Sequence, residues 1–109
     1  MKDKIKKIYN PMTESCFYIL FCLQEEMHGY SISTKVKEMT NGEVTISPGT
    51  MYGTLSKIEK DGLISLVHEE NKRKIYLITE LGKEVLNTEI NRIKRVYKNI
   101  NEGGKCYER

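Results

Sequence analysis

Apolar residues recur at helical spacing in three segments of the first part of the chain. The first of these segments includes the run Cys16–Leu23, which is apolar on nearly every side, and a helix of that kind is buried on more than one face. Ser47 followed by Pro48 is the strongest helix start, because serine caps a helix and proline suits its first turn. The pattern predicts three helices, over residues 14–26, 30–40 and 48–61.

After Gly62 the spacing of apolar residues changes from helical to alternating. Two alternating runs, which begin at Ile64 and Ile75, are separated by the charged segment 70–73, in which Asn71 suits a left-handed turn conformation. These runs predict a β-hairpin with a charged tip. Thr79 then caps a last helix that we expect to reach about residue 101.

Three helices followed by a β-hairpin form the layout of a winged helix-turn-helix, in which the third helix enters the DNA major groove and the hairpin is the wing. The predicted fold class is therefore mainly α with a β-hairpin, a winged helix-turn-helix plus a long C-terminal dimerisation helix. We expect residues 1–79 to form the DNA-binding domain and residues 80–109 to form the dimerisation helix and tail, both within one compact unit.

The third helix separates apolar positions from small, hydroxylic and basic ones. On a helical wheel, Met51, Leu55 and Ile58 form the core stripe, while Tyr52 lies on the flank. Small residues allow close approach to a groove wall, and hydroxyl and N–H groups at a helix start bind phosphate oxygens. The outward face holds Gly49, Thr50, Gly53, Ser56, Lys57 and Lys60.

The last helix carries a heptad pattern of apolar residues, which keeps one stripe facing a partner helix. We expect this stripe to form a dimer seam that acts together with the first helix. In that helix, we expect Phe17 or Phe21 to face the partner subunit or a central cavity, while Ile19, Leu20 or Leu23 serves the local core. The seam residues are Leu86, Ile90, Ile93, Tyr97 and Ile100, and the residues expected on a solvated flank between them are Glu89, Arg92, Lys94, Arg95 and Lys98.

Composition and charge narrow the class of protein. With 109 residues, 39% hydrophobic and 30% charged, the chain has the balance of one soluble domain. Its net charge of +3 is the sum of +3 over residues 1–10, −5 over residues 11–70 and +5 over residues 71–109, and such asymmetry can mark a polyanion-binding face. No apolar run is long enough to span a bilayer and no secretory signal is evident, so we expect a cytoplasmic protein without a membrane partner.

Catalytic and metal-binding chemistry has little support in the sequence. His28 precedes a turn glycine and His68 lies near acids in a strand, and neither has a partner at metal-ligand spacing. Cys16 and Cys22 lie inside an apolar run and resemble buried packing residues, and with Cys106 they form no CxxC pair. We therefore expect no enzyme activity, no metal and no cofactor.

Four segments in this order resemble the PadR family of transcriptional regulators: PMTESCFYILFCL, MHGYSI, SPGTMYGTLSKIEKDGLI and RKIYLITELGKEVL, within residues 11–86. The short closing helix resembles the small subfamily that has a single C-terminal helix. The resemblance implies a dimeric winged-helix DNA-binding protein, usually a repressor. It places DNA-binding roles on Ser47, Gly49, Thr50, Tyr52 and Lys57, and on Lys72, Arg73 and Lys74 in the wing.

Some short members of that family bind planar ligands at the dimer centre through an aromatic residue of the last helix. Here Ile93 stands at the corresponding position, with Tyr97 one turn later, and the chain has no Trp. A small-molecule effector therefore remains a possible partner, whereas a flat aromatic one is not expected. Pairing of two chains predicts a palindromic operator in double-stranded DNA.

Two other readings of the sequence stay open. A winged-helix interaction module without DNA binding would fit the acidic middle of the chain and its modest net charge. A peripheral membrane protein that uses residues 1–10 is a weaker alternative, because this segment offers only Ile5, Ile8 and Tyr9 as apolar anchors.

Overall fold

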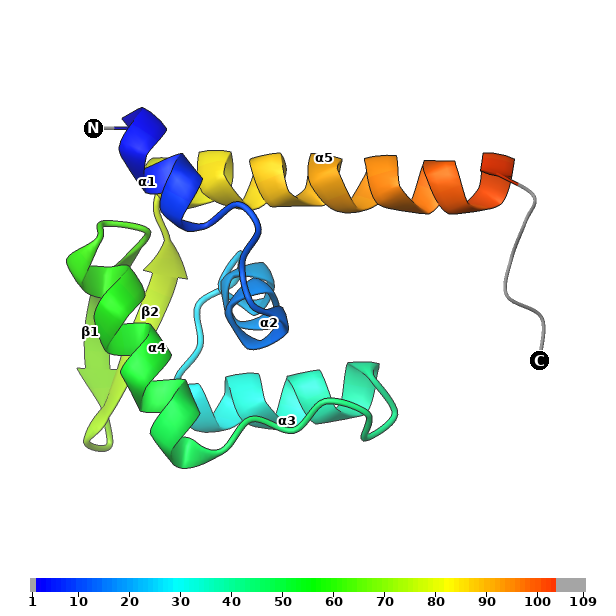
Figure 1. The fold of residues 1–109 in the computed structure, drawn as a ribbon. Coiled ribbons are helices and arrows are strands. Elements are labelled where there is room, and N and C mark those ends of the chain that lie inside the picture. Colours follow the sequence, from blue (N-terminus) through cyan, green and yellow to red (C-terminus); the bar gives the residue numbers. More distant parts are fainter. Residues whose placement is uncertain (1, 104–109) are drawn as a thin grey trace.

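The computed structural model describes residues 2–103, and their elements follow the predicted order, with one additional helix at the N-terminus (Figure 1). The prediction of a mainly α fold with a β-hairpin and a long C-terminal helix is confirmed. Cys106 and the rest of the expected tail lie outside the described residues. The elements are α1 (Lys2–Ile8), α2 (Glu14–Cys22), α3 (Gly29–Met39), α4 (Pro48–Lys60), β1 (Ile64–Glu70), β2 (Arg73–Ile78) and α5 (Glu80–Gly103).

Local capping residues begin the helices where the sequence predicts them. The side-chain oxygens of Thr13, Ser47 and Thr79 each accept a hydrogen bond from a backbone N–H three residues later, at 3.1, 3.2 and 3.0 Å. At the other end of α4, Gly62 has a φ of 83°, which is a left-handed conformation that glycine adopts without steric cost. These short-range contacts fix both ends of α4.

The helix α2 ends at Cys22, so the prediction that it continues to residue 26 is wrong. The chain after Cys22 pairs with the hairpin instead of continuing as a helix. The Leu23 carbonyl accepts from the N–H of Ile78 at 2.8 Å, and Met27 exchanges two backbone hydrogen bonds with Tyr76, at 3.3 and 3.1 Å. This long-range pairing joins the loop after α2 to the base of the wing.

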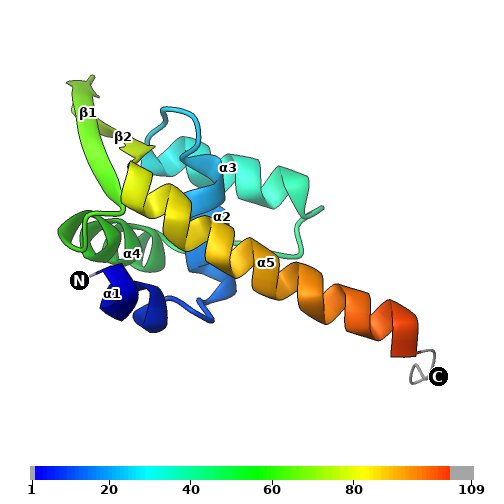
Figure 2. The same ribbon diagram turned by 90° about the horizontal axis from the view of Figure 1, so that it is seen from above.

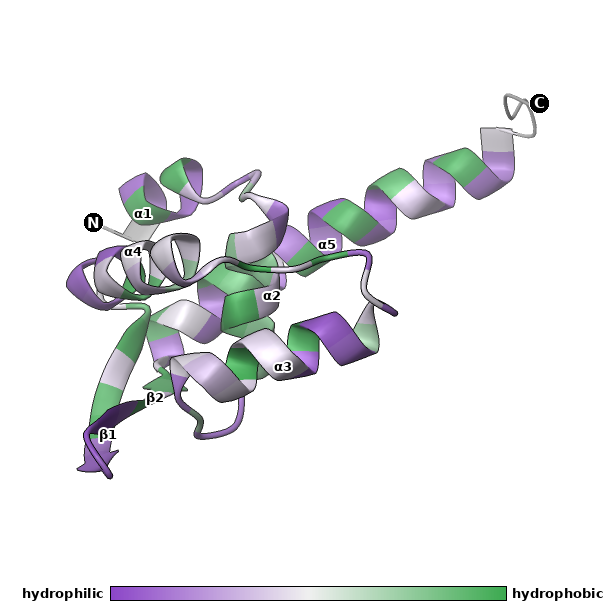
Figure 3. Ribbon diagram, turned by 90° about the horizontal axis from the view of Figure 1, so that it is seen from below, coloured by the Kyte–Doolittle hydropathy of each residue, from purple (hydrophilic) through white to green (hydrophobic). Residues whose placement is uncertain are grey.

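The core forms around α2, which lies between α3, α4 and α5 (Figures 1 and 2). Ile19, Leu20 and Leu23 are completely buried, which confirms that they serve the local core. When the molecule is coloured by hydropathy, α2 forms an apolar centre and the tip of the hairpin is hydrophilic (Figure 3). The hairpin therefore packs through its base and projects its tip away from the core.

The hairpin is antiparallel, with its turn at Asn71 and Lys72. Both residues have a positive φ, 52° and 65°, which matches the tight two-residue turn that suits the twist of paired strands. The left-handed conformation predicted for Asn71 is confirmed, whereas that of Lys72 was not expected. The register shifts between Leu66 and His68, and this bulge interrupts the predicted alternation along β1.

The helix α5 begins in close contact with the base of the hairpin and then extends beyond the rest of the molecule (Figure 2). A Cβ atom at Gly82 would lie 2.6 Å from Cγ1 of Ile78 and 3.0 Å from the carbonyl carbon of Leu63, so only glycine permits this approach. Residues 93–103 of α5 are exposed along the protruding part. None of the described helices is long and apolar enough to cross a membrane.

Candidate nucleic-acid interface

The exposed face of α4 matches the face that the sequence predicts. Met51, Leu55 and Ile58 are buried in the core, and the residues on the opposite side are open to solvent. A Cβ atom at either Gly49 or Gly53 would meet nothing within 4 Å, so neither glycine is required by packing inside the chain. This face therefore has room for a large partner to approach its backbone.

The first turn of α4 presents hydroxyl groups at the positive end of the helix dipole. Ser47 caps the helix, and its hydroxyl also donates to the hydroxyl of Thr50 at 3.1 Å. Both side chains, together with Pro48 and Gly49, are exposed. A helix N-terminus with exposed hydroxyls favours anions, because its unpaired N–H groups and its dipole both attract negative charge.

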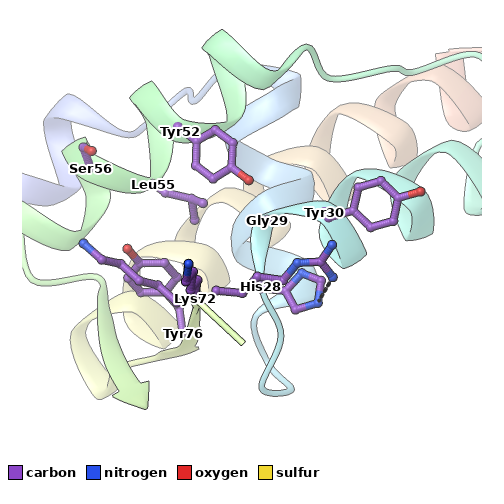
Figure 4. Close-up of a pocket in the computed structure, with 10 residues that line it drawn as sticks. His28, Gly29, Tyr30, Tyr52, Leu55, Ser56, Lys72 and Tyr76 are labelled. Carbon is purple, nitrogen blue, oxygen red and sulfur yellow. Dashed lines mark hydrogen bonds between the residues drawn. The ribbon is translucent and has the colours of Figure 1, made fainter. Parts of the chain in front are cut away.

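A groove of about 490 Å³ separates α4 from the hairpin (Figure 4). Tyr52, Leu55 and Ser56 line it from α4, and Tyr76 lines it from β2. Burial raises the pKa of the Tyr76 hydroxyl, and the nearby carboxylates of Glu59 and Glu69 raise it further, so this group stays neutral. The hairpin contributes the predicted cations Lys72, Arg73 and Lys74.

Arg73 is held against the start of α3. Its Nη1 lies 3.3 Å from Nε2 of His28, and its guanidinium lies 5.4 Å from the centre of the Tyr30 ring. His28 is the N-cap of α3, where its Nδ1 accepts from the N–H of Ser31 at 3.3 Å. Arg73 thus brings the tip of the hairpin against the start of α3, over the Tyr30 ring.

Sequence reasoning missed His28 and Tyr30 as parts of this site, although both belong to the MHGY segment. The glycine between them has a packing role. A Cβ atom at Gly29 would lie 3.1 Å from Cε1 of Tyr52 and 3.2 Å from Cγ of Met51, so glycine lets the Tyr52 ring lie against α3. The segment therefore positions Arg73 on one side and Tyr52 on the other.

Lys57 does not join the other predicted site residues at this groove. It is exposed, but its ammonium group lies 4.7 Å from the centre of the Tyr9 ring and donates to the Tyr9 hydroxyl at 3.4 Å. The structure thus brings Tyr52 together with the three wing cations, leaves Ser47, Gly49 and Thr50 at the start of α4, and directs Lys57 towards α1.

The protruding half of α5 carries the second predicted surface. Ile93, Tyr97 and Ile100 are 40, 65 and 54% exposed, and Val96 adds to the same apolar surface. Phe21 of α2 is also exposed, and its ring stacks on Phe17 with the centroids 5.8 Å apart.

Two expectations about α5 need correction. Leu86 is only 3% exposed and packs in the core of its own chain, against which Ile90 also packs, so Leu86 does not belong to a seam between chains. Glu89 is not on a solvated flank, because it is 1% exposed and accepts two hydrogen bonds from Arg92, at 2.9 and 2.8 Å. These bonds and one from the backbone of Met12 lower the pKa of Glu89, although burial opposes them.

The groups that gather at this groove are suited to binding an anionic partner. Burial raises the pKa of the Cys16 thiol to about 11 and also raises that of Cys22, so both thiols stay protonated near neutral pH. Within residues 2–103, no three His, Cys, Asp or Glu side chains group in a way that could hold a metal ion. What the site presents instead is a groove with cations, hydroxyls and a helix N-terminus.

The model of the PadR-like family of transcriptional regulators matches residues 19–88 of this chain. A curated relative, the transcriptional regulator YqjI of Escherichia coli (strain K12), is 29% identical over 77 residues, which cover 71% of this chain and 37% of that protein. An uncharacterized protein of Lysinibacillus sphaericus is 35% identical over 69 residues, which cover 60% of this chain and 63% of that one. The chain thus spans little more than a third of the Escherichia coli relative.

Solved structures share the fold. A transcriptional regulator from Clostridium thermocellum has a TM-score of 0.71 and 27% identity, over 83% of this chain and 92% of that one. A PadR family transcription regulator from Clostridium difficile has a TM-score of 0.69 and 27% identity, over 80% of this chain and 94% of that one. The structure of Bacillus subtilis PadR in complex with operator DNA has a TM-score of 0.61 and 28% identity, over 71% of this chain and 46% of that one.

Proposed function

This chain belongs to the PadR-like family of transcriptional regulators, and we propose that it is a sequence-specific DNA-binding regulator, a dimeric repressor released from its operator by a small-molecule or other signal. Membership of this family makes the chain a regulator rather than an enzyme. The similarity to Bacillus subtilis PadR, whose structure was solved with operator DNA, supports double-stranded DNA as the partner.

The observation that carries the proposal is the convergence of hydroxyls and cations on one groove. Lys72, Arg73 and Lys74 of the wing line it together with Tyr52 and Ser56 of α4. Cations and hydroxyls bind phosphate oxygens, and these contacts fix the register of a protein on the duplex. In this proposal the wing contacts the DNA backbone while α4 lies in the major groove.

The start of α4 supplies the second part of the proposed interface. Ser47 and Thr50 present hydroxyls at the helix N-terminus, and Gly49 leaves the backbone accessible beside them. A phosphate at this position would be attracted by the helix dipole and would accept hydrogen bonds from the hydroxyls of Ser47 and Thr50. Lys57 lies on the flank of α4 that faces α1. We propose that it contacts a phosphate of the DNA strand opposite the one that the start of α4 contacts.

Dimerisation is supported by the apolar surface of the protruding half of α5. Ile93, Val96, Tyr97 and Ile100 are exposed, and Phe21 of α2 is exposed as well. Burying these side chains against a second copy stabilises a dimer by about 25 cal/mol for each Å² of apolar area removed from water. A two-fold dimer presents two copies of α4, which predicts a palindromic operator with half-sites about 34 Å apart or a multiple of that distance.

A salt titration separates this function from the alternative of an interaction module without DNA binding. Binding sequences would be selected from a random duplex library, and affinity for the best sequence would be measured at several salt concentrations. We expect Lys72→Ala and Arg73→Ala each to weaken binding and to reduce the salt slope by about one, because each removes a phosphate contact. Lys83→Ala on α5 is the matched control. Failure to select any sequence, or unchanged binding in both wing variants, would refute the proposal.

A neutral substitution tests whether α4 itself lies against DNA. Gly53→Gln introduces no charge, suits a helix and enters open space in the free protein, so the fold should tolerate it. If the exposed face of α4 enters the major groove, the added side chain meets the groove wall and specific affinity falls at least tenfold. Asn87→Gln on the exposed surface of α5 is the control, and equal affinity of the two variants would exclude α4 from the interface.

If a small molecule releases the chain from DNA, the chain needs an effector site whose occupation weakens DNA binding. A depression of about 390 Å³ lies between α2 and α5, where Phe17, Tyr18 and Ile93 provide apolar walls beside the Glu89–Arg92 pair. Its position next to the proposed dimer surface supports an effector that changes the pairing of the chains. A reporter gene behind the selected operator tests the repressor role: repression in cells that express the chain supports a repressor, and activation would contradict it.

A further inference from the structure

Tyr9, at the end of α1, is a buried polar residue whose hydroxyl points towards α4. It is 5% exposed, and its hydroxyl donates to Oδ2 of Asp61 at 2.6 Å. Burial and the hydrogen bond to Asp61 raise the pKa of this hydroxyl, so it keeps its proton and remains a donor at every physiological pH. A short hydrogen bond to a carboxylate is among the stronger ones in proteins.

Asp61 is the C-cap residue, directly after the last residue of α4. A carboxylate at this position meets the negative end of the helix dipole, which is unfavourable unless another group stabilises it. The Tyr9 hydroxyl provides that stabilisation from a different helix, 52 positions away in the chain. One turn earlier, Lys57 of α4 lies over the Tyr9 ring at 4.7 Å and donates to its hydroxyl at 3.4 Å. The side chain of Tyr9, directly after α1, thus contacts the C-terminal end of α4 at Lys57 and at the C-cap Asp61.

The same short helix also contacts α5. Lys6 lies 3.5 Å from Oε1 of Glu84, and α1 packs against the first half of α5. Figure 2 shows α1 beside α4, with α5 crossing above the core. The helix α1 therefore connects the helix that carries the proposed dimer surface to the helix that carries the proposed DNA-binding face.

We propose that α1 is a clamp on the DNA-reading helix and that Tyr9 is a positioning residue, which fixes the C-terminal end of α4 through Asp61 and Lys57. This inference rests on the proposed DNA-binding function, because α4 needs a fixed orientation only if it reads a sequence. Tyr9 itself touches no DNA in this proposal. It acts by limiting the rotation of α4 relative to α5, and so the loss of its hydroxyl should reduce specific binding more than non-specific binding.

The test compares Tyr9→Phe, Asp61→Asn and the double variant with wild type and with Tyr18→Phe, which removes a hydroxyl of the same kind from α2. We expect Tyr9→Phe to lower affinity for the selected operator five- to tenfold, while affinity for unrelated duplex and the salt slope stay unchanged. Since both residues form one hydrogen bond, the double variant should be no weaker than the weaker single variant. A purely structural role would lower the urea midpoint without changing operator affinity in fully folded protein, and that result would overturn the proposal.

Hydrogen exchange tests the clamp without DNA. The backbone N–H groups of residues 57–63 should exchange at least fivefold faster in Tyr9→Phe than in wild type, whereas those of α3 should not change. If wild type selects no DNA sequence, the proposed function fails and the exchange rates alone decide on the clamp. Unchanged exchange at the end of α4 would refute the clamp even if wild type binds DNA.

Discussion

Replacing Gly82 by alanine should destabilise the chain more than its small size suggests. The added Cβ would lie 2.6 Å from Cγ1 of Ile78 and 3.0 Å from the carbonyl carbon of Leu63, and it would be closer still to the carbonyl oxygen of Leu63. That oxygen accepts a hydrogen bond from the N–H of Thr79 at 2.9 Å, so the backbone in front of the new methyl group is already held in place. Relief of the overlap therefore requires α5 to move away from the hairpin.

The magnitude follows from two opposing effects. Overpacking of a close-packed site costs about 1–3 kcal/mol, and an obstacle made of backbone atoms favours the upper end of that range. Alanine in place of glycine within a helix raises the free energy of unfolding by about 1 kcal/mol, because alanine has the higher helix propensity. The net expectation for Gly82→Ala is a loss of about 2 kcal/mol in the free energy of unfolding. Gly53→Ala is the matched control, because its Cβ meets nothing within 4 Å and only the helix-forming gain applies.

Urea unfolding followed by circular dichroism measures both variants. Protein concentration must be equal in every sample, since association of chains would add to the apparent stability. With a slope of about 2 kcal/mol per molar urea, the midpoint of Gly82→Ala should fall by about 1 M and that of Gly53→Ala should rise by up to about 0.5 M. A Gly82→Ala midpoint equal to that of wild type would show that α5 does not pack on the hairpin as closely as described.

Three further predictions concern the buried carboxylate of Glu89, the two buried cysteines and the exposed apolar residues of α5. Because the pKa of Glu89 is lowered in the folded chain, its contribution to stability is complete above the ordinary carboxyl pKa of about 4.3 and is lost as pH falls through the lower folded value. Glu89→Gln should therefore cost about 1–3 kcal/mol at pH 7 and much less in acid, as urea titrations at several pH values would reveal. Cys16 and Cys22 should resist alkylation by iodoacetamide at pH 8 until urea unfolds the chain, and rapid labelling of either in the folded state, read by mass spectrometry, would contradict their burial. Ile93→Asp with Ile100→Asp should convert a dimer to monomers in sedimentation equilibrium and abolish operator binding, and a double variant that remains dimeric would exclude this surface.

Features determined by neighbouring residues could be predicted from the sequence. The caps at Thr13, Ser47 and Thr79 each need only a backbone N–H three residues later, and all three are present. The core stripe of α4 also follows from local spacing alone. The position of Asn71 in the turn has the same origin, because the left-handed conformation is a property of the residue and the turn.

Features that depend on distant parts of the chain could not be predicted in the same way. After α2 ends, the Leu23 carbonyl accepts from Ile78 and Met27 exchanges two hydrogen bonds with Tyr76, some fifty residues later in the hairpin. Helical periodicity cannot register this pairing, and it overestimated the length of α2. Glu89 falls on the flank of a helical wheel, but in the fold it is buried and accepts hydrogen bonds from Arg92 and from the backbone of Met12, which the wheel does not predict.

The candidate site was predicted in its composition but not in its geometry. The three wing cations and Tyr52 could be chosen from the sequence, and they do line one groove. The contact of Arg73 with His28 could not be foreseen, since it joins residues 45 positions apart. Lys57 appeared equivalent to the other cations on the wheel, yet its ammonium group turns to the Tyr9 ring because α1, which the sequence did not predict as a helix, lies beside it.

The close packing of α5 on the hairpin at Gly82 fixes the position of the proposed dimer surface relative to the proposed DNA-binding face. The helix α5 has 24 residues and is therefore about 36 Å long at 1.5 Å per residue, and its exposed apolar residues lie in the half that is farther from Gly82. A small change in the angle between α5 and the hairpin at Gly82 displaces the far end of this long helix by several ångströms. The packing at Gly82 therefore determines where a second chain would sit relative to α4. In the proposed dimer, operator half-sites would have to match the separation of the two α4 helices, so close packing at this glycine would set their spacing. Under the proposed function, the same packing would serve both the stability of the chain and the geometry of DNA recognition.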